Sequence, residues 1–118
     1  MRGKILTILL GVVVVACSAV NRSDEEIDAE FTRQAVLGCV SHGKHGTTPE
    51  ALRKNCQCVA HEELLGTPPN IRRLLVEHRM TLTAEEFANI YDSDRVNAGI
   101  RMNCPAAYKA WSQSTGGG

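Results

Sequence analysis

The sequence has few aromatic residues, no excess of either charge and few of the motifs that mark enzymes. One Trp, two Tyr and two Phe leave little aromatic material for a core. Lys and Arg balance Asp and Glu at 13 each, which argues against a nucleic-acid-binding protein, because such proteins carry a basic excess. The nucleophile elbow, the phosphate-binding glycine loop and the Cys-x-x-Cys-His haem motif are all missing. We therefore expect neither catalysis nor a bound cofactor.

Residues 1–16 have the features of a secretory signal. Arg2 and Lys4 precede an uncharged apolar stretch that is too short for a permanent membrane span. This stretch ends in Val14-Val15-Ala16-Cys17, which resembles the lipobox of bacterial lipoproteins. By that resemblance Cys17 is the lipidated first residue of the mature protein, residues 17–22 form a short tether, and Ser18 indicates sorting to the outer membrane, facing the periplasm. The alternative is an ordinary signal that is cut after Ala19. Both interpretations predict an exported protein.

Helical periodicity and helix-capping patterns run through the rest of the chain, and no alternating pattern predicts a strand. Ser23 with Glu26 and Thr83 with Glu86 have the spacing of capping boxes. Further helix starts are expected at Thr48-Pro49, Asn70, Ser93 and Pro105. The sequence therefore predicts an all-α domain over residues 23–111, a small bundle of four to five short helices braced by two disulfides. Residues 112–118 are expected to form a disordered tail.

The mature domain has an even number of cysteines, which favours two disulfides in a small exported protein. They are Cys39, Cys56, Cys58 and Cys104. Residues two apart on a helix point about 200° away from each other, so Cys56 and Cys58 are expected to pair with different elements. Two pairings remain open: 39–56 with 58–104, or 39–58 with 56–104. Each closure contributes about 3 to 4 kcal/mol in the chain-entropy treatment.

A metal-binding or thiol-redox site is the alternative use of these sulfur atoms. Cys39, Cys56 and Cys58 together with His42, His45 and His61 offer ligand types that suit zinc or copper. The opposed directions of Cys56 and Cys58 count against one compact site, and no βαβ pattern indicates a thioredoxin-like frame. His61-Glu62 begins like a zinc-protease motif, but Leu65 stands where the second histidine is needed. We therefore expect no metal site.

Arg72, Arg73 and Arg79 form a cationic cluster that is a possible contact for an acidic protein or anionic lipid. The simpler interpretation is a solvated helix face. The cysteine layout from about Phe31 to Cys104, together with Glu86-Phe87, resembles small four-cysteine helical exported proteins of Gram-negative bacteria, most of which have no assigned activity.

Lipoproteins of this size and build include immunity proteins against periplasmic toxins, conjugal entry-exclusion proteins and accessory subunits of envelope machines. The resemblance therefore implies a membrane-anchored envelope lipoprotein that acts by binding another protein. The alternative function is that of a periplasmic metal-binding or thiol-redox protein.

Overall fold

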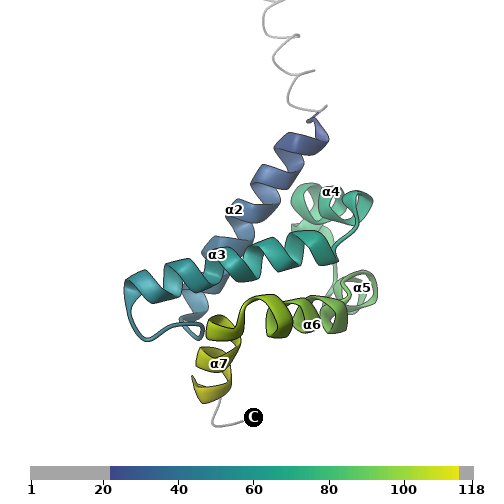
Figure 1. The fold of residues 1–118 in the computed structure, drawn as a ribbon. Helices are drawn as coiled ribbons and strands as arrows, with labels where there is room; N and C mark the ends of the chain where they lie inside the picture. Colours follow the sequence, from purple (N-terminus) through teal and green to yellow (C-terminus); the bar gives the residue numbers. More distant parts are fainter. Residues whose placement is uncertain (1–21, 115–118) are drawn as a thin grey trace, which may run out of the picture.

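Residues 22–114, the part of the chain that the computed structural model describes, fold into six α-helices and one 3₁₀ turn (Figure 1). The helices are α2 (Asp24–His42), α3 (Pro49–Gly66), α4 (Pro69–His78), α5 (Ala84–Ile90), α6 (Ser93–Asn103) and α7 (Pro105–Ser114), and the turn is η1 (Arg79–Thr81). No strand occurs within these residues, so the all-α prediction is confirmed, with one helix more than the four to five expected. None of the described helices combines the length and apolar character that a bilayer span needs.

Local capping explains where three of the helices begin. The Ser23 hydroxyl accepts the Glu26 N–H at 3.2 Å, and the Thr48 hydroxyl accepts the Ala51 N–H at 3.1 Å. Thr83 and Glu86 form a reciprocal capping box, with bonds of 3.0 and 3.1 Å. These side chains satisfy backbone donors that have no partner inside the helix. The three predicted starts are therefore confirmed.

Two other predicted caps were wrong. The helix α4 begins at Pro69, so Asn70 lies inside it rather than before it. A proline at the first helical position has no N–H to satisfy, and the helix can start there without a side-chain cap. Asp92 caps α6 in place of Ser93, because its carboxylate accepts the Arg95 N–H at 3.1 Å.

The last helix starts at Pro105 as predicted but extends further than predicted. We expected a disordered tail from residue 112, whereas α7 continues to Ser114. The Ser114 hydroxyl donates to the Lys44 carbonyl at 3.3 Å and to the Trp111 carbonyl at 2.9 Å. The first of these bonds attaches the end of α7 to the loop that joins α2 and α3. Residues 115–118 lie outside the described part of the chain.

The central helix is α3, which packs against α2 on one side and against α6 and α7 on the other (Figure 1). The contact with α6 is close at Gly66, where an added Cβ would lie 2.8 Å from Val96 Cγ2. The buried core cluster has members on all four of these helices and consists of Cys39, Cys56, Val59, Val96, Ile100, Cys104 and Ala107. The core is therefore small and contains cysteine sulfur atoms.

Both disulfides attach to α3 and hold it from different directions. Cys39–Cys56 joins α2 to α3 with a Cα–Cα distance of 5.6 Å, and Cys58–Cys104 joins α3 to the end of α6 at 5.9 Å. The prediction of two disulfides is confirmed, and of the two pairings left open the structure has the first. Cys56 is fully buried and Cys104 is 3% exposed. The cross-links thus fill part of the core that the scarce aromatic residues leave unfilled.

Candidate functional site

A cleft of about 400 Å³ is bounded by α2, α3, α7 and the segment from η1 to the end of α5. The helix α3 contributes Val59 and Glu63, and the other elements contribute most of the aromatic lining. That lining consists of Phe31, Phe87, Tyr91 and Trp111. A hollow of about 370 Å³ adjoins the cleft, because Val59, Glu63, Tyr91, Trp111 and His45 line both. Together they form one recess beside α3.

The cleft stays open because the helix beside it is short and one residue of its wall has no side chain. The helix α5 contains no buried residue. On α2, Gly38 lines the cleft, and a Cβ added there would meet no atom within 4 Å. Phe87 and Tyr91 stack with ring centroids 5.1 Å apart, which gives the α5 side of the cleft an apolar surface. The recess is therefore lined by large rings but is not filled by them.

Glu63 is the acidic residue of the cleft, and it differs from its sequence neighbour in having no partner. Glu62 is 7% exposed, and its Oε1 accepts a hydrogen bond from Asn103 Nδ2 at 2.9 Å. Glu63 is partly buried, and among residues 22–114 its carboxylate makes neither a hydrogen bond nor an ion pair. Burial raises the pKa of Glu63 to about 7, and Arg79 acts in the opposite direction. The burial of Tyr91, together with the nearby charge of Glu63, raises the pKa of the Tyr91 hydroxyl.

The raised pKa of Glu63 makes the stability of the domain depend on pH. Between pH 4.5 and about 7 the folded protein holds a proton that the unfolded chain releases, so stability should fall as the pH rises through this window. The expected loss is about 1 to 3 kcal/mol after allowance for solvent access to the cleft. Other titratable or charged groups that line the cleft are Arg79, Tyr91, His42, His45 and Lys44.

Urea unfolding at pH 5 and pH 8 measures this effect. Glu63→Gln should remove this part of the pH dependence. Glu50→Gln, which changes an exposed acid at the start of α3, should leave the pH dependence unchanged. Equal pH profiles for the native chain and Glu63→Gln would contradict the assignment.

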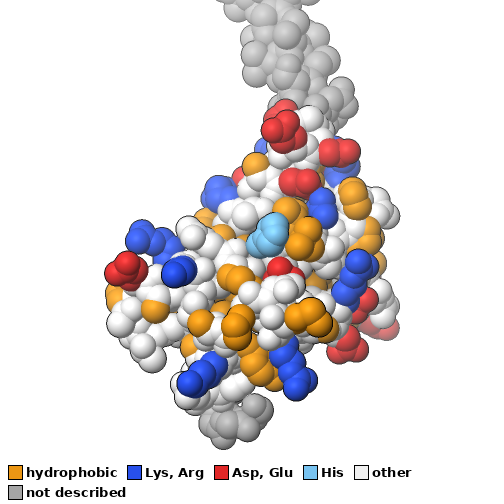
Figure 2. Space-filling view, viewed as in Figure 1, with side chains coloured by type: hydrophobic (Ala, Val, Ile, Leu, Met, Phe, Trp, Pro, Cys, Tyr) orange, Lys and Arg blue, Asp and Glu red, His pale blue; other side chains and the backbone are white. Residues whose placement is uncertain are grey.

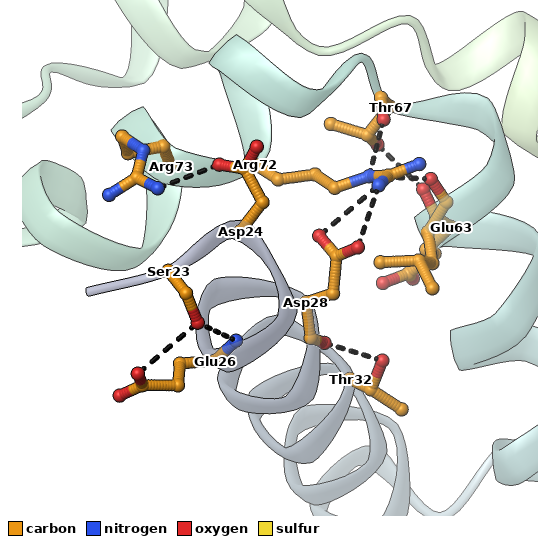
Figure 3. A network of polar contacts seen from close by, with 10 residues as sticks. Ser23, Asp24, Glu26, Asp28, Thr32, Glu63, Thr67, Arg72 and Arg73 are labelled. Carbon is orange, nitrogen blue, oxygen red and sulfur yellow. Dashed lines mark hydrogen bonds and ion pairs between the residues drawn. The ribbon is translucent and has the colours of Figure 1, made fainter.

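The structure does not gather the three predicted partner-contact arginines into one surface. The side chain of Arg72 is only 14% exposed and lies between helices (Figure 3). Its Nη1 donates to both carboxylate oxygens of Asp28 at 3.1 Å, and its Nε donates to the carbonyls of Leu64 and Thr67 at 3.0 and 2.7 Å. Arg72 thus connects α2 and α4 to the end of α3, and its Nε and Nη1 groups are used within the domain.

The other two arginines of the cluster point to different neighbours. Arg73 pairs with Asp24 at 2.7 Å (Figure 3) and with Glu77 at 3.0 Å. Arg79 lies over the Phe87 ring, 5.8 Å from its centroid, at the edge of the cleft. Of the three, Arg79 alone lines the candidate site. Its contact with a partner stays a prediction.

Arg72→Ala should lower the free energy of unfolding by about 2 kcal/mol, because it takes the Arg72 donors away from Asp28 and from the Thr67 carbonyl and leaves the Leu64 carbonyl with the Thr67 N–H as its remaining donor. Arg73→Ala is the matched control. It removes ion pairs that are more exposed to water than those of Arg72, and exposed ion pairs contribute little to stability. Chemical denaturation of both variants checks the difference. A loss for Arg72→Ala no larger than that for Arg73→Ala would contradict the role of Arg72 as an interhelical clamp.

The sulfur and histidine residues of the alternative metal or thiol site do not come together. The four cysteines of the mature domain are paired as disulfides and offer no thiolate ligand. Within residues 22–114 no three His, Cys, Asp or Glu side chains lie close enough to hold a metal ion. His45 Nδ1 lies 3.1 Å from the Ala107 carbonyl, and His61 is exposed on α3. The predicted lipidation residue, Cys17, lies outside the described residues, as do the signal and nearly all of the tether.

Comparison with protein-family models, curated proteins and solved structures finds no match. Function is therefore inferred from the residues of this chain.

Glu63 is not among the site residues predicted from the sequence, although its position on the helix could have indicated it. Cys56, Val59 and Glu63 recur at helical spacing, so an acid occupies a position of the apolar stripe of α3. An acid at such a position is a candidate for a perturbed pKa and a functional role.

Proposed function

We propose that this protein is a membrane-anchored lipoprotein of the bacterial envelope that acts by binding another protein. The observation that carries the proposal is the open cleft beside α3, which offers apolar walls and a charged group. Recesses of this size with a few polar groups are typical of binding sites. The partner is a secreted toxin or a subunit of an envelope machine, and the protein acts on it as an inhibitor or an accessory subunit.

Two features support the proposed location. The two disulfides indicate an oxidising compartment and therefore an exported protein. The lipobox-like segment that ends in Cys17 supports a lipid anchor in the outer membrane, with the domain facing the periplasm.

Acidic side chains gather at the start of α2 (Figure 2), where Asp24, Glu25 and Glu26 form the first turn. Their charge would keep this end of the domain from lying flat on anionic headgroups.

Exposed apolar side chains offer a second area for contact with a protein. Figure 2 shows hydrophobic side chains over α3 and α6 on the face that it presents. Large apolar residues on these helices are unusually exposed, with Leu65 at 54% and Met102 at 79%. Such side chains are common at protein interfaces.

In-cell cross-linking of the full-length protein tests the proposal. A short-range cross-linker applied to intact cells, followed by purification of the tagged lipoprotein, should yield one protein partner in near-stoichiometric amount. The same purification after Glu50→Gln, which changes an exposed acid at the start of α3 outside the lining of the cleft, serves as the control and should yield the same partner. Recovery of no protein above background would contradict a binding function.

A further inference from the structure

The cleft combines the carboxylate of Glu63, which has no hydrogen bond or ion pair within residues 22–114, with several aromatic walls. This combination suits the binding of a long basic side chain. We propose that the cleft receives a lysine or arginine side chain of the partner protein, with the Glu63 carboxylate as its acceptor. This inference rests on the proposed protein-binding function and adds to it the site and the chemistry of recognition. The evidence is the charge of Glu63, the shape and rings of the walls, and the charges at the edge of the cleft.

The carboxylate of Glu63 is partly withdrawn from water and makes no hydrogen bond within the described residues. Withdrawing a carboxylate from water costs free energy unless a donor or a cation compensates for it. The acid next to it in sequence, Glu62, has such a donor in Asn103, whereas Glu63 has none among residues 22–114. Burial raises its pKa to about 7, although the nearby charge of Arg79 acts against this shift. An ammonium or guanidinium group bound in the cleft would supply the missing charge and donors.

The walls suit the apolar stem of a long basic side chain. Phe31, Phe87, Tyr91 and Trp111 line the cleft beside Glu63. Lysine and arginine pack their methylene groups on apolar surfaces, and their cationic heads are attracted to aromatic faces. Arg79 shows this contact within the molecule, because its guanidinium lies over the Phe87 ring. The volume of about 400 Å³ accommodates an incoming side chain together with the backbone that carries it.

Positively charged side chains line the cleft together with Glu63, and they limit the kind of partner segment that can bind. Arg79 and Lys44 line the cleft, as do His42 and His45. A strongly basic segment would be repelled by these groups, whereas a single basic residue flanked by acidic residues complements both the edge and Glu63. The expected recognition element is therefore a lysine or arginine between acidic residues.

Two capped tripeptides test this chemistry on the purified full-length protein. The first is glutamate-lysine-glutamate, and the second has norleucine in place of lysine and so keeps the stem without the charge. Trp111, the single tryptophan of the chain, lines the cleft and reports binding through its fluorescence. We expect saturable binding of the lysine peptide with a Kd of roughly 1 mM and at least tenfold weaker binding of the norleucine peptide. Equal binding of the two peptides, or no saturation by the lysine peptide, would overturn the proposal.

Three variants locate the binding in the cleft. Glu63→Gln should weaken the lysine peptide at least tenfold, and Gly38→Leu should do the same by filling the space next to Gly38. Gln57→Leu is the matched control, because Gln57 is exposed on α3 outside the lining of the cleft, and it should bind as the native chain does. Circular dichroism verifies that each variant is folded. Retained affinity in Glu63→Gln would overturn the role of Glu63.

The pH dependence of binding separates a direct role of Glu63 from a structural one. In the native chain the affinity for the lysine peptide should fall as the pH is lowered through about 7, because Glu63 then takes up a proton. This component should be absent from Glu63→Gln, although the effects of His42 and His45 remain in both proteins. Identical pH profiles would overturn the direct role.

A position-specific cross-link distinguishes failure of this inference from failure of the proposed function. A photoreactive amino acid replaces Gln34, which lines the cleft, or Gln57, which is exposed on α3 outside the lining. Capture of the partner from position 34 supports the inference. Capture from position 57 alone overturns the cleft as the contact but leaves a protein-binding function. Capture from neither position contradicts both.

Discussion

Removing the Cys58–Cys104 disulfide should lower the free energy of unfolding by about 4 kcal/mol, since this bond closes the longer loop of the domain. The double variant Cys58→Ala with Cys104→Ala avoids a stranded thiol. The matched control is Cys39→Ala with Cys56→Ala, which opens a loop with a sequence separation of 17 instead of 46 and should cost about 3 kcal/mol. Because many small domains have a total stability of only 5 to 15 kcal/mol, both variants should melt far below the native protein. Unchanged melting curves would contradict the two-bridge structure.

The pairing itself is tested by the thiol that a single substitution exposes. In Cys39→Ala the freed thiol should be Cys56, because Cys39 pairs with Cys56 in the structure. Denaturation without reductant, alkylation near neutral pH and fragment-ion mass spectrometry then identify the labelled residue. Label on Cys58 would indicate the alternative pairing.

Cys17→Ala should move the protein from the membrane fraction to the soluble periplasmic fraction almost completely. Stable membrane attachment through acyl chains needs the lipidated cysteine. The substitution also leaves an alanine two residues before Ala19, a pattern that suits ordinary signal cleavage. Fractionation of cells followed by mass analysis of the mature N-terminus measures the result.

Ser18→Ala is the control for Cys17→Ala and should stay attached to the membrane. The helical domain should be unaffected by either change, because its described contacts lie within residues 22–114. A Cys17→Ala protein that remains in the membrane fraction after signal cleavage, or a native chain without acyl groups, would contradict the lipoprotein proposal.

Features that depend on neighbours in sequence were predictable. The caps at Ser23, Thr48 and Thr83 involve partners three residues away, so a local pattern contains all the information that they need. The prediction that Cys56 and Cys58 pair with different elements follows in the same way from helix geometry. The predicted helix starts at Asn70 and Ser93 were each wrong by one residue, because the neighbouring residue can also start a helix.

Features that depend on distant contacts were not predictable. The role of Arg72 rests on Asp28, which lies 44 residues away, and no local pattern links the two. The choice between the two disulfide pairings likewise depends on how α2 and α6 pack on α3. Glu63 was visible as an acid in an apolar stripe, but its lack of a partner depends on where η1 and α5 lie. The candidate site is therefore a property of the packing, and only its individual residues can be read from the chain.

The placement of both cross-links on α3 has a mechanical consequence. When the protein is pulled between its two ends, tension passes from Cys39 to Cys56, crosses Gln57 and leaves through Cys58 to Cys104. The stretches between 39 and 56 and between 58 and 104, which include most of the cleft lining, are bypassed by covalent bonds. A chain that is held at one end and pulled at the other would therefore extend at its two ends, while the bypassed stretches, with Glu63 among them, carry no load.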